Sequence, residues 1–357
     1  MRYLKLPLVL SRMASIDLRQ SRELFLILLL ALSITAGAFS VSGCSVLQDP
    51  GFIAYTSGPE GNRNIEVIRP DGSQRTAIIA HPADDFSPRW SPDHKLIAFL
   101  SNRDGNTELY VSPADGSTVM RTTNTSVAES QPIWSPEAKS LAFVSPDSLD
   151  RPHIYIMEIS DLAPRRLSFG TIGEKDPSWS PDGKWIAFAA IDEDSNSIGI
   201  FLRNPIGVNR IHLTHGPDSQ PSWSPDSDKL AFVSERDGNQ EIYVVDISGN
   251  SFPEPLRLTD NPANDFAPLW SPNGERIAFL STRSGHISIY AVSPEGDHLG
   301  ALTQNEVDER SFVWGPSGEI AFISELTDNP ALFVMDGNGE NQQVVLSGEL
   351  DYTLPDW

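Results

Sequence analysis

The stretch Trp179-Ser180-Pro181-Asp182-Gly183-Lys184-Trp185-Ile186-Ala187-Phe188 decides the fold. A tryptophan ends one extended segment, Ser-Pro-Asp-Gly turns the chain, and an apolar run begins the next segment. Proline presets φ at the second turn position, Asp suits the third, and Gly accepts the conformation of the fourth. The stretch therefore predicts two strands joined by a tight turn.

This unit recurs along the chain at a nearly constant spacing. The tryptophans are 44, 45, 44, 47, 44 and 43 residues apart. They are Trp90, Trp134, Trp179, Trp223, Trp270, Trp314 and the terminal Trp357. A period in the mid-forties is typical of the blades of a β-propeller.

Each repeat contains further extended segments. An apolar run with a central alanine follows the tryptophan turn, as in Ile97-Ala98-Phe99, and seven such runs occur. They lack polar alternation, as expected of strands buried on both faces. A third segment has an aromatic centre in most copies, and a fourth ends in Leu-Thr or a similar pair, as at Leu213-Thr214. We therefore expect an all-β chain with four antiparallel strands per repeat.

The two ends of the repeat array complement each other. The first copy begins at Gly51 without a tryptophan strand, whereas Leu354-Pro355-Asp356-Trp357 is such a strand without a continuation. Joining them closes the ring and removes two exposed sheet edges. We predict a single closed seven-bladed propeller over residues 51–357, with the C-terminal strand completing the first blade. Six blades with one degenerate copy is the alternative.

The repeat resembles the WD-like repeat of the TolB family, which reads roughly Pro-x-Trp-Ser-Pro-Asp-Gly-x-x-Ile-Ala-Phe. The resemblance covers residues 51–357. It implies a propeller that docks proteins at the mouth of its central channel. Bacterial TolB itself has an α/β domain before a six-bladed propeller, and we expect neither feature here, so TolB's own partners do not carry over.

The composition restricts the partners. Formal net charge is −22, and residues 44–357 hold 21 basic and 46 acidic groups, or −25. Nucleic acid is a poor partner, because its binding depends on neutralising phosphates with Lys and Arg. A basic protein segment or a divalent cation fits the sign of the charge. The single cysteine excludes a disulfide framework within the chain.

The N-terminal segment has the pattern of an export signal. Basic residues precede an apolar run from Leu24 to Val41, which ends in Val41-Ser42-Gly43-Cys44. The last four residues resemble the bacterial lipobox, whose cysteine is acylated. We expect a signal peptide over residues 1–43, a lipidated tether over 44–50 and a bilayer anchor at Cys44. An uncleaved membrane anchor is the alternative, since 18 apolar residues just span a bilayer.

A column of acidic residues stands five positions before the tryptophans. Six of the seven copies have a carboxylate there, and the seventh has Tyr352 with Asp351 beside it. Two interpretations stay open: carboxylates that cap backbone N–H groups and hold the blade connections, or a ring at the channel mouth that docks basic peptides or binds cations, with Ca²⁺ as the candidate ion. The candidate binding residues are Asp85, Glu129, Glu174, Asp218, Asp265, Glu309 and Asp351.

Catalysis is the alternative class of function. Some seven-bladed relatives are polysaccharide lyases with a His-bound metal in the channel, but the seven histidines here are scattered without ligand spacing. No Gly-x-Ser-x-Gly motif of a serine peptidase occurs. We therefore predict no catalytic residues and leave the identity of any metal open. The prediction is a non-catalytic, membrane-anchored envelope lipoprotein that binds other envelope proteins, located on the periplasmic side of the outer membrane if the cell is Gram-negative. A carbohydrate-active enzyme with a metal in the channel is the alternative.

Overall fold

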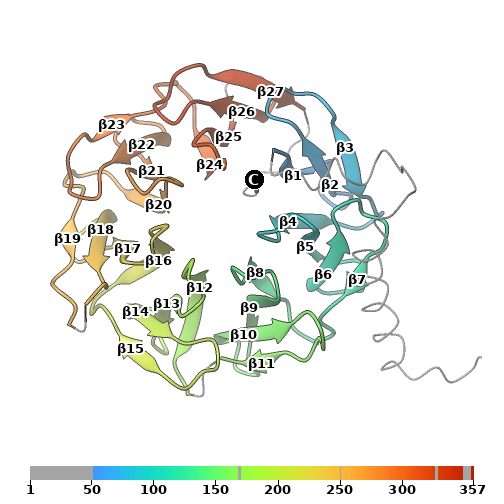
Figure 1. Cartoon of the computed structure of the whole chain (residues 1–357), viewed down its shortest axis with the longest axis horizontal. Coiled ribbons are helices and arrows are strands. Elements are labelled where there is room, and N and C mark those ends of the chain that lie inside the picture. The colour runs from blue at the N-terminus through green and yellow to red at the C-terminus, as the bar shows by residue number, and fades with distance from the viewer. Residues whose placement is uncertain (1–50, 168–169, 250, 326–328, 349–354) are drawn as a thin grey trace, which may run out of the picture. The chain divides into compact units, whose positions relative to one another are not determined.

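The structure is a computed structural model that describes residues 51–167, 170–249, 251–325, 329–348 and 355–357. The expected signal peptide and tether, Cys44 and Asp351 lie outside this described part. Seven antiparallel sheets stand around a central axis as the blades of a propeller (Figure 1). The predicted all-β fold with seven blades is confirmed. Within the described residues, no helix has the length and apolar character needed to cross a membrane.

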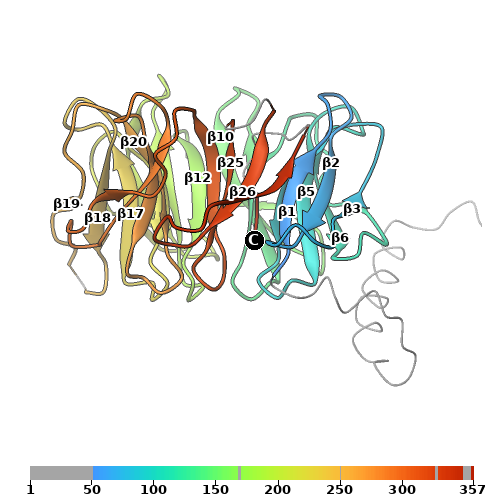
Figure 2. The same ribbon diagram turned by 90° about the horizontal axis from the view of Figure 1, so that it is seen from above.

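Every blade runs from the axis outward in chain order, and Figure 2 shows its strands crossing between the two faces of the disc. Innermost strands carry the acidic column and the tryptophan. They are β4 (Asp85–Trp90), β8 (Ser130–Trp134), β12 (Gly173–Trp179), β16 (Asp218–Trp223), β20 (Asp265–Trp270) and β24 (Glu309–Trp314).

Second and third strands form the apolar body of each blade. The second strands are β1 (Ile53–Ser57), β5 (Leu96–Ser101), β9 (Ser140–Pro146), β13 (Ile186–Ile191), β17 (Lys229–Ser234), β21 (Ile277–Ser281) and β25 (Ile320–Ser324). The third strands are β2 (Asn64–Ile68), β6 (Glu108–Pro113), β10 (Pro152–Glu158), β14 (Ser197–Arg203), β18 (Glu241–Asp246), β22 (Ser288–Val292) and β26 (Ala331–Met335).

Outer strands are short, and five of them contain only two or three residues. They are β3 (Thr76–Ile79), β7 (Met120–Arg121), β11 (Arg165–Arg166), β15 (Arg210–His212), β19 (Leu256–Arg257), β23 (Gly300–Ala301) and β27 (Gln343–Ser347). We number the blades in chain order, so that blade 1 contains β1–β3, blade 2 contains β4–β7, and blade 7 contains β24–β27.

The core consists of seven clusters, each between two neighbouring blades. In one cluster, Ala98 of blade 2 packs with Trp134 and Phe143 of blade 3. The central alanine of the second strand is fully buried in all seven blades. An alanine fits there because a larger side chain would hold the neighbouring blade away.

Blade 7 closes onto blade 1. One cluster contains Ile53 and Tyr55 of blade 1 together with Ala321 and Leu332 of blade 7. The C-terminus supplies the remaining inner contact, because Asp356 forms two backbone hydrogen bonds with Ala54, of 2.8 and 2.9 Å. The C-terminal segment therefore completes blade 1 as predicted, but through a single β-bridge. The sheet of blade 1 itself has three strands.

Candidate functional site

The acidic column lies where the innermost strands begin, and its side chains are buried. Asp85, Asp218, Asp265 and Glu309 are 0% exposed, and Glu129 and Glu174 are 2% exposed. Two interpretations of this column were open: carboxylates that hold the blade connections, or a ring at the channel mouth that docks a partner. The structure places the six described members inside the blades.

The three aspartates of the column each pair with an arginine 18 residues later. In blade 5, Arg236 Nη2 donates to both carboxylate oxygens of Asp218, at 2.9 and 3.0 Å. The Arg236 guanidinium also lies 4.7 Å from the centre of the Tyr243 ring, within cation–π range. Blades 2 and 6 repeat this arrangement with Asp85–Arg103 and Asp265–Arg283, both at 2.6 Å.

None of these arginines was among the predicted site residues, although the sequence carries a pattern that marks them. The arginine follows the second strand in the pattern Ser-x-Arg-x-Gly, as in Ser234-Glu235-Arg236-Asp237-Gly238. The serine hydroxyl accepts a bond from Arg236 Nε at 2.8 Å and so fixes the side chain. Copies with glutamate in the column lack this arginine: Asp147, Asp192 and Leu326 occupy its position.

Glutamates of the column accept hydrogen bonds from neutral side chains, each with one oxygen left unpaired in blades 3 and 7 of the described structure. Glu129 Oε1 accepts from the hydroxyls of Thr125 and Ser145, at 2.9 and 3.2 Å, while its Oε2 is buried without a partner in the described structure. Burial, assisted by the nearby Glu108 carboxylate, raises the pKa of Glu129 to about 7. Burial likewise raises the pKa of Glu309, whose carboxylate accepts a bond from Asn305 at 2.8 Å.

Exposed carboxylates lie on the same face of the disc as the start of the innermost strands. They belong to the turns between second and third strands and to the connections between blades. These two kinds of loop are joined directly, for example by Glu235 N–H to Pro217 O at 3.1 Å and Asp265 N–H to Gln240 O at 2.8 Å. We name the following exposed residues of blades 4 to 7 and their connections the acidic rim: Glu193, Asp194, Glu235, Asp260 and Glu306.

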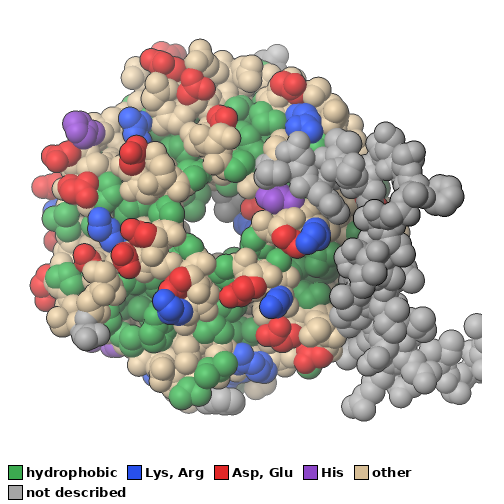
Figure 3. Space-filling view, in the orientation of Figure 1, with side chains coloured by type: hydrophobic (Ala, Val, Ile, Leu, Met, Phe, Trp, Pro, Cys, Tyr) green, Lys and Arg blue, Asp and Glu red, His purple; other side chains and the backbone are tan. Residues whose placement is uncertain are grey.

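The channel wall is polar where the innermost strands bulge. Gln131, Asp176 and Gln220 have φ values of 51–55°, and the strand register shifts at each of them. Gln131 Nε2 donates to Asp176 Oδ1 at 3.0 Å, and Asp176 N–H donates back to Gln131 Oε1 at 2.9 Å. These bonds connect neighbouring blades around the axis. Figure 3 shows the opening on the axis, with acidic and basic side chains interspersed around it.

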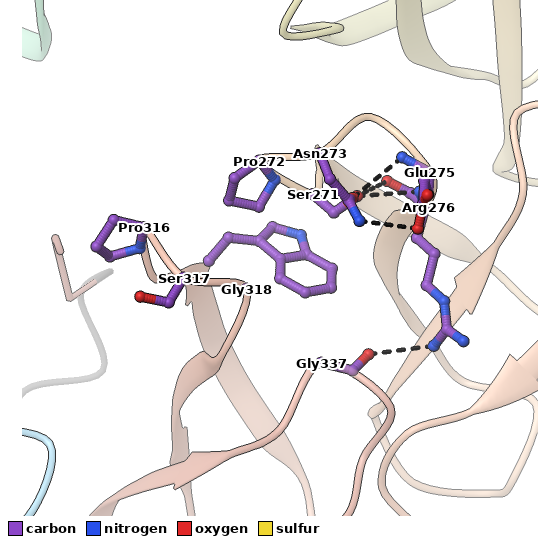
Figure 4. A pocket seen from close by; sticks show the side chains of 10 residues that line it. Ser271, Pro272, Asn273, Glu275, Arg276, Pro316, Ser317, Gly318 and Gly337 are labelled. Atoms are coloured by element: carbon purple, nitrogen blue, oxygen red, sulfur yellow. Dashed lines mark hydrogen bonds between the residues drawn. The ribbon is translucent and has the colours of Figure 1, made fainter.

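The opposite face carries the Ser-Pro-Asp-Gly turns, and a hollow of about 440 Å³ lies there between blades 6 and 7. Trp314, Pro272 and Pro316 give it apolar walls. Arg276 Nη1 reaches across it to Gly337 O at 3.2 Å (Figure 4). No member of the acidic column or the acidic rim lines this hollow.

Histidines do not gather at the axis. His212 and His215 are the pair that the structure brings together, with ring centres 3.8 Å apart, beside the outer strand β15. Among the described residues, no group of three His, Cys, Asp or Glu side chains has the arrangement of a metal site.

Comparison with known families shows to which family the repeats belong. A family model for the TolB β-propeller domain matches residues 39–216 and 207–357, which together include every blade. The chain belongs to the TolB β-propeller family. No curated protein matches the sequence of this TolB-family chain.

Solved structures resemble this TolB-family propeller at low identity. An Agrobacterium tumefaciens protein assigned as a TolB is 25% identical, with 67% of this chain and 89% of that chain covered and a TM-score of 0.53. TolB from Acinetobacter baumannii is 20% identical, with 92% and 69% covered and a TM-score of 0.56. An oligogalacturonate lyase in complex with manganese is 14% identical, with 81% and 86% covered and a TM-score of 0.66. The last two likenesses concern the fold alone.

Proposed function

We propose that this TolB-family chain is a non-catalytic envelope lipoprotein that docks other envelope proteins through basic segments. Anchoring would occur through an acylated Cys44, which holds the propeller at a membrane outside the cytoplasm. The observation that carries the docking proposal is the acidic rim. Its five carboxylates are exposed on one face of a propeller unit with a net charge of −25 over residues 44–357.

The rim differs from the buried acidic column in its availability. No hydrogen bond or ion pair joins Glu193, Asp194 or Glu306 side chains to other described side chains, whereas the column carboxylates are enclosed within the blades. A basic segment approaching the rim would lose little of its own hydration and would be attracted over about one Debye length, ~8 Å at physiological salt. Such a surface increases the association rate and selects the sign of the partner's charge.

The experiment is capture of solubilised envelope proteins by the full chain and by a rim variant. The rim variant carries Glu193→Gln, Asp194→Asn, Glu235→Gln and Glu306→Gln. A matched control removes four exposed carboxylates from the opposite face: Asp228→Asn, Glu254→Gln, Asp297→Asn and Glu340→Gln. We expect a captured protein to be lost with the rim variant alone, and its binding to weaken steeply with added salt. Equal capture by both variants would move the docking surface elsewhere.

A further inference from the structure

A second hollow, of about 640 Å³, lies at the outer edge of the propeller between blades 3 and 4. Blade 4 contributes Ile198 of β14 and Arg210 and His212 of β15. The connection from β11 to β12 contributes Gly170, Thr171 and Ile172. Phe201 forms the floor. Figure 1 shows the outer strands β11 and β15 as neighbours along this edge.

The wall formed by blade 4 is a stack of planar side chains. The His212 ring is 4.0 Å from the Phe201 ring at an interplanar angle of 10°, and the Arg210 guanidinium lies 4.2 Å from the Phe201 ring centre. Phe201 is buried beneath them, while Arg210 and His212 are exposed. Gly199 permits this stack: its φ is 132°, and a Cβ there would lie 2.0 Å from Thr214 O and 2.9 Å from His212 Nε2.

The opposite lip is held by arginines of blade 3. Arg166 Nη2 donates to Gly170 O at 2.8 Å, and Arg151 Nη1 donates to Thr171 O at 2.9 Å. The Thr171 side chain is exposed on this lip, and Ile172 is half-buried beside it. The hollow therefore has two fixed sides, one with a cation and flat rings, the other with a hydroxyl and an apolar side chain.

Comparison of the blades reveals an excess of positive charge here. In blades 2 and 5, the outer-strand arginine pairs with a buried glutamate of the third strand: Arg121 with Glu108 at 2.8 Å and Arg257 with Glu241 at 3.0 Å. His153 replaces this glutamate in blade 3, where it lies 2.8 Å from Arg166. Gly199 replaces it in blade 4.

The arginines around the hollow differ in their partners: Arg151 pairs with Asp147 at 2.8 Å, and the Glu174 carboxylate acts electrostatically on Arg203. Among the ion pairs of the described residues, none involves Arg166, Arg203 or Arg210. The Nε atoms of Arg166 and Arg203 are buried and have no hydrogen-bond partner there. Arg203 is opposite Arg210 in the strand register, so the two cations lie side by side. In a strongly acidic protein, an exposed arginine without an ion pair, as Arg210 is among the described residues, attracts an anion.

We infer that the hollow between blades 3 and 4 binds an acidic sugar, a pyranose ring that carries a carboxylate or a phosphate. Arg210 receives the anionic group, and its planar guanidinium suits bidentate contact with oxyanions. The apolar face of the ring lies on Ile172 and Ile198, and Thr171 is the hydroxyl partner. The volume falls within the range of small-ligand sites, about 300–1,000 Å³. This site uses no residue of the acidic rim, so either proposal can fail without the other.

The test is isothermal titration of the detergent-solubilised full chain with digalacturonate and with glucose 6-phosphate. Maltose is the neutral comparison, and inorganic phosphate is the anion without a ring. We expect binding of at least one acidic sugar and no heat with maltose. Arg210→Ala should weaken this binding at least tenfold, and Arg210→Lys less so, because a lysine keeps the charge but loses the planar geometry.

Lys184→Ala serves as the matched control. It removes one exposed basic group beside a Ser-Pro-Asp-Gly turn, away from the hollow, and should leave the affinity for the acidic sugar unchanged. Three results would overturn the inference. One is no binding of either acidic sugar. Another is a comparison compound that binds as tightly as the acidic sugar it is compared with: maltose against either acidic sugar, or inorganic phosphate against glucose 6-phosphate. The third is an equal loss of affinity in Arg210→Ala and Lys184→Ala. A circular dichroism melt confirms that each variant is folded.

Discussion

The buried pair of Asp218 and Arg236 shows what the acidic column does for a single blade. Asp218 is fully buried and Arg236 holds both of its oxygens, so Arg236→Ala would leave a carboxylate without its counter-charge. Loss of one partner of a buried pair costs about 3–5 kcal/mol, and the side-chain exposure of Arg236, 26%, places it at the lower end. We expect the free energy of unfolding to fall by about 3 kcal/mol in urea titrations.

Lys184→Ala provides the comparison for this prediction. Its ammonium pairs with Asp182 at 2.7 Å, but the lysine side chain is 74% exposed. Exposed pairs contribute little to stability because water screens them. Similar losses in Arg236→Ala and Lys184→Ala would show that the column pairs add no more than surface pairs.

Glu129 gives the stability a dependence on pH. Its pKa is about 7 in the folded protein against 4.5 for an ordinary glutamate. Between these values the folded state keeps a proton that the unfolded state has released, so the stability from this group falls as pH rises through the window, by at most about 1.4 kcal/mol per pH unit. Glu129→Gln is neutral at every pH and should remove this slope.

The measurement is urea unfolding at pH 5, 6, 7 and 8 for both proteins. Wild type should lose stability relative to Glu129→Gln as pH increases. Glu193→Gln, in which the replaced carboxylate is exposed, should run parallel to wild type. Parallel curves for Glu129→Gln as well would mean that Glu129 is ionised throughout this range.

The sequence predicted the positions of the residues in the acidic column but not the burial of their side chains. Its regular spacing followed from the tryptophans, whereas its enclosure depends on partners 16 to 18 residues away, such as Ser145 and Arg236. The Ser-x-Arg-x-Gly pattern could have revealed the arginines. The exposed acids of the rim follow no fixed position in the repeat, so the repeat pattern does not predict them.

The tryptophan turn is the element that the sequence predicted best, because its geometry depends on neighbouring residues alone. In blade 4, Ser180 Oγ donates to Asp182 Oδ1 at 2.7 Å and accepts from Trp185 N–H at 3.0 Å. Outer strands were the least predictable elements. β7 and β19 are two residues long, and such strands exist only because the third strand beside them offers hydrogen-bond partners.

Gly315 departs from the serine that begins the tryptophan turn in the other copies, and the structure gives a physical reason. It occupies the position of Ser180 in blade 7, and a Cβ there would lie 2.8 Å from ring atoms of Trp357. Gly315→Ser restores the residue of the other copies, and a change toward a consensus commonly stabilises a protein. Here we expect the reverse, a loss of about 1–3 kcal/mol from overpacking.

Thermal unfolding of Gly315→Ser measures this effect, with Ser317→Asp as the matched control. Ser317 is exposed in the same turn, and aspartate is the residue of most other copies. We expect the control to leave the melting temperature unchanged or slightly higher. A melting temperature of Gly315→Ser equal to wild type would show that Trp357 can move away without loss.

Closure of the ring is a property of the whole molecule, because it joins residues about 300 positions apart in the chain. Asp356 pairs with the Ala54 backbone, and its Oδ2 accepts from Trp90 N–H at 2.5 Å. Burial raises the pKa of Asp356, so the closing contact includes a carboxylate that is costly to ionise. Trp357 packs in the cluster between blades 7 and 1.

Deletion of residues 355–357 should therefore open the ring at one inner edge. The truncated chain loses both Ala54 bridge bonds, the bond to Trp90 and the Trp357 packing, while the contacts of Ile53 and Tyr55 with blade 7 remain. We expect the melting temperature to fall by more than about 5 °C, since a loss of 1 kcal/mol corresponds to about 2–4 °C in large domains. Asp356→Asn should lose less than the deletion, because it keeps the backbone bridge. If the deletion variant melts within a degree or two of wild type, the outer contacts alone hold blades 7 and 1 together and the terminal bridge is dispensable.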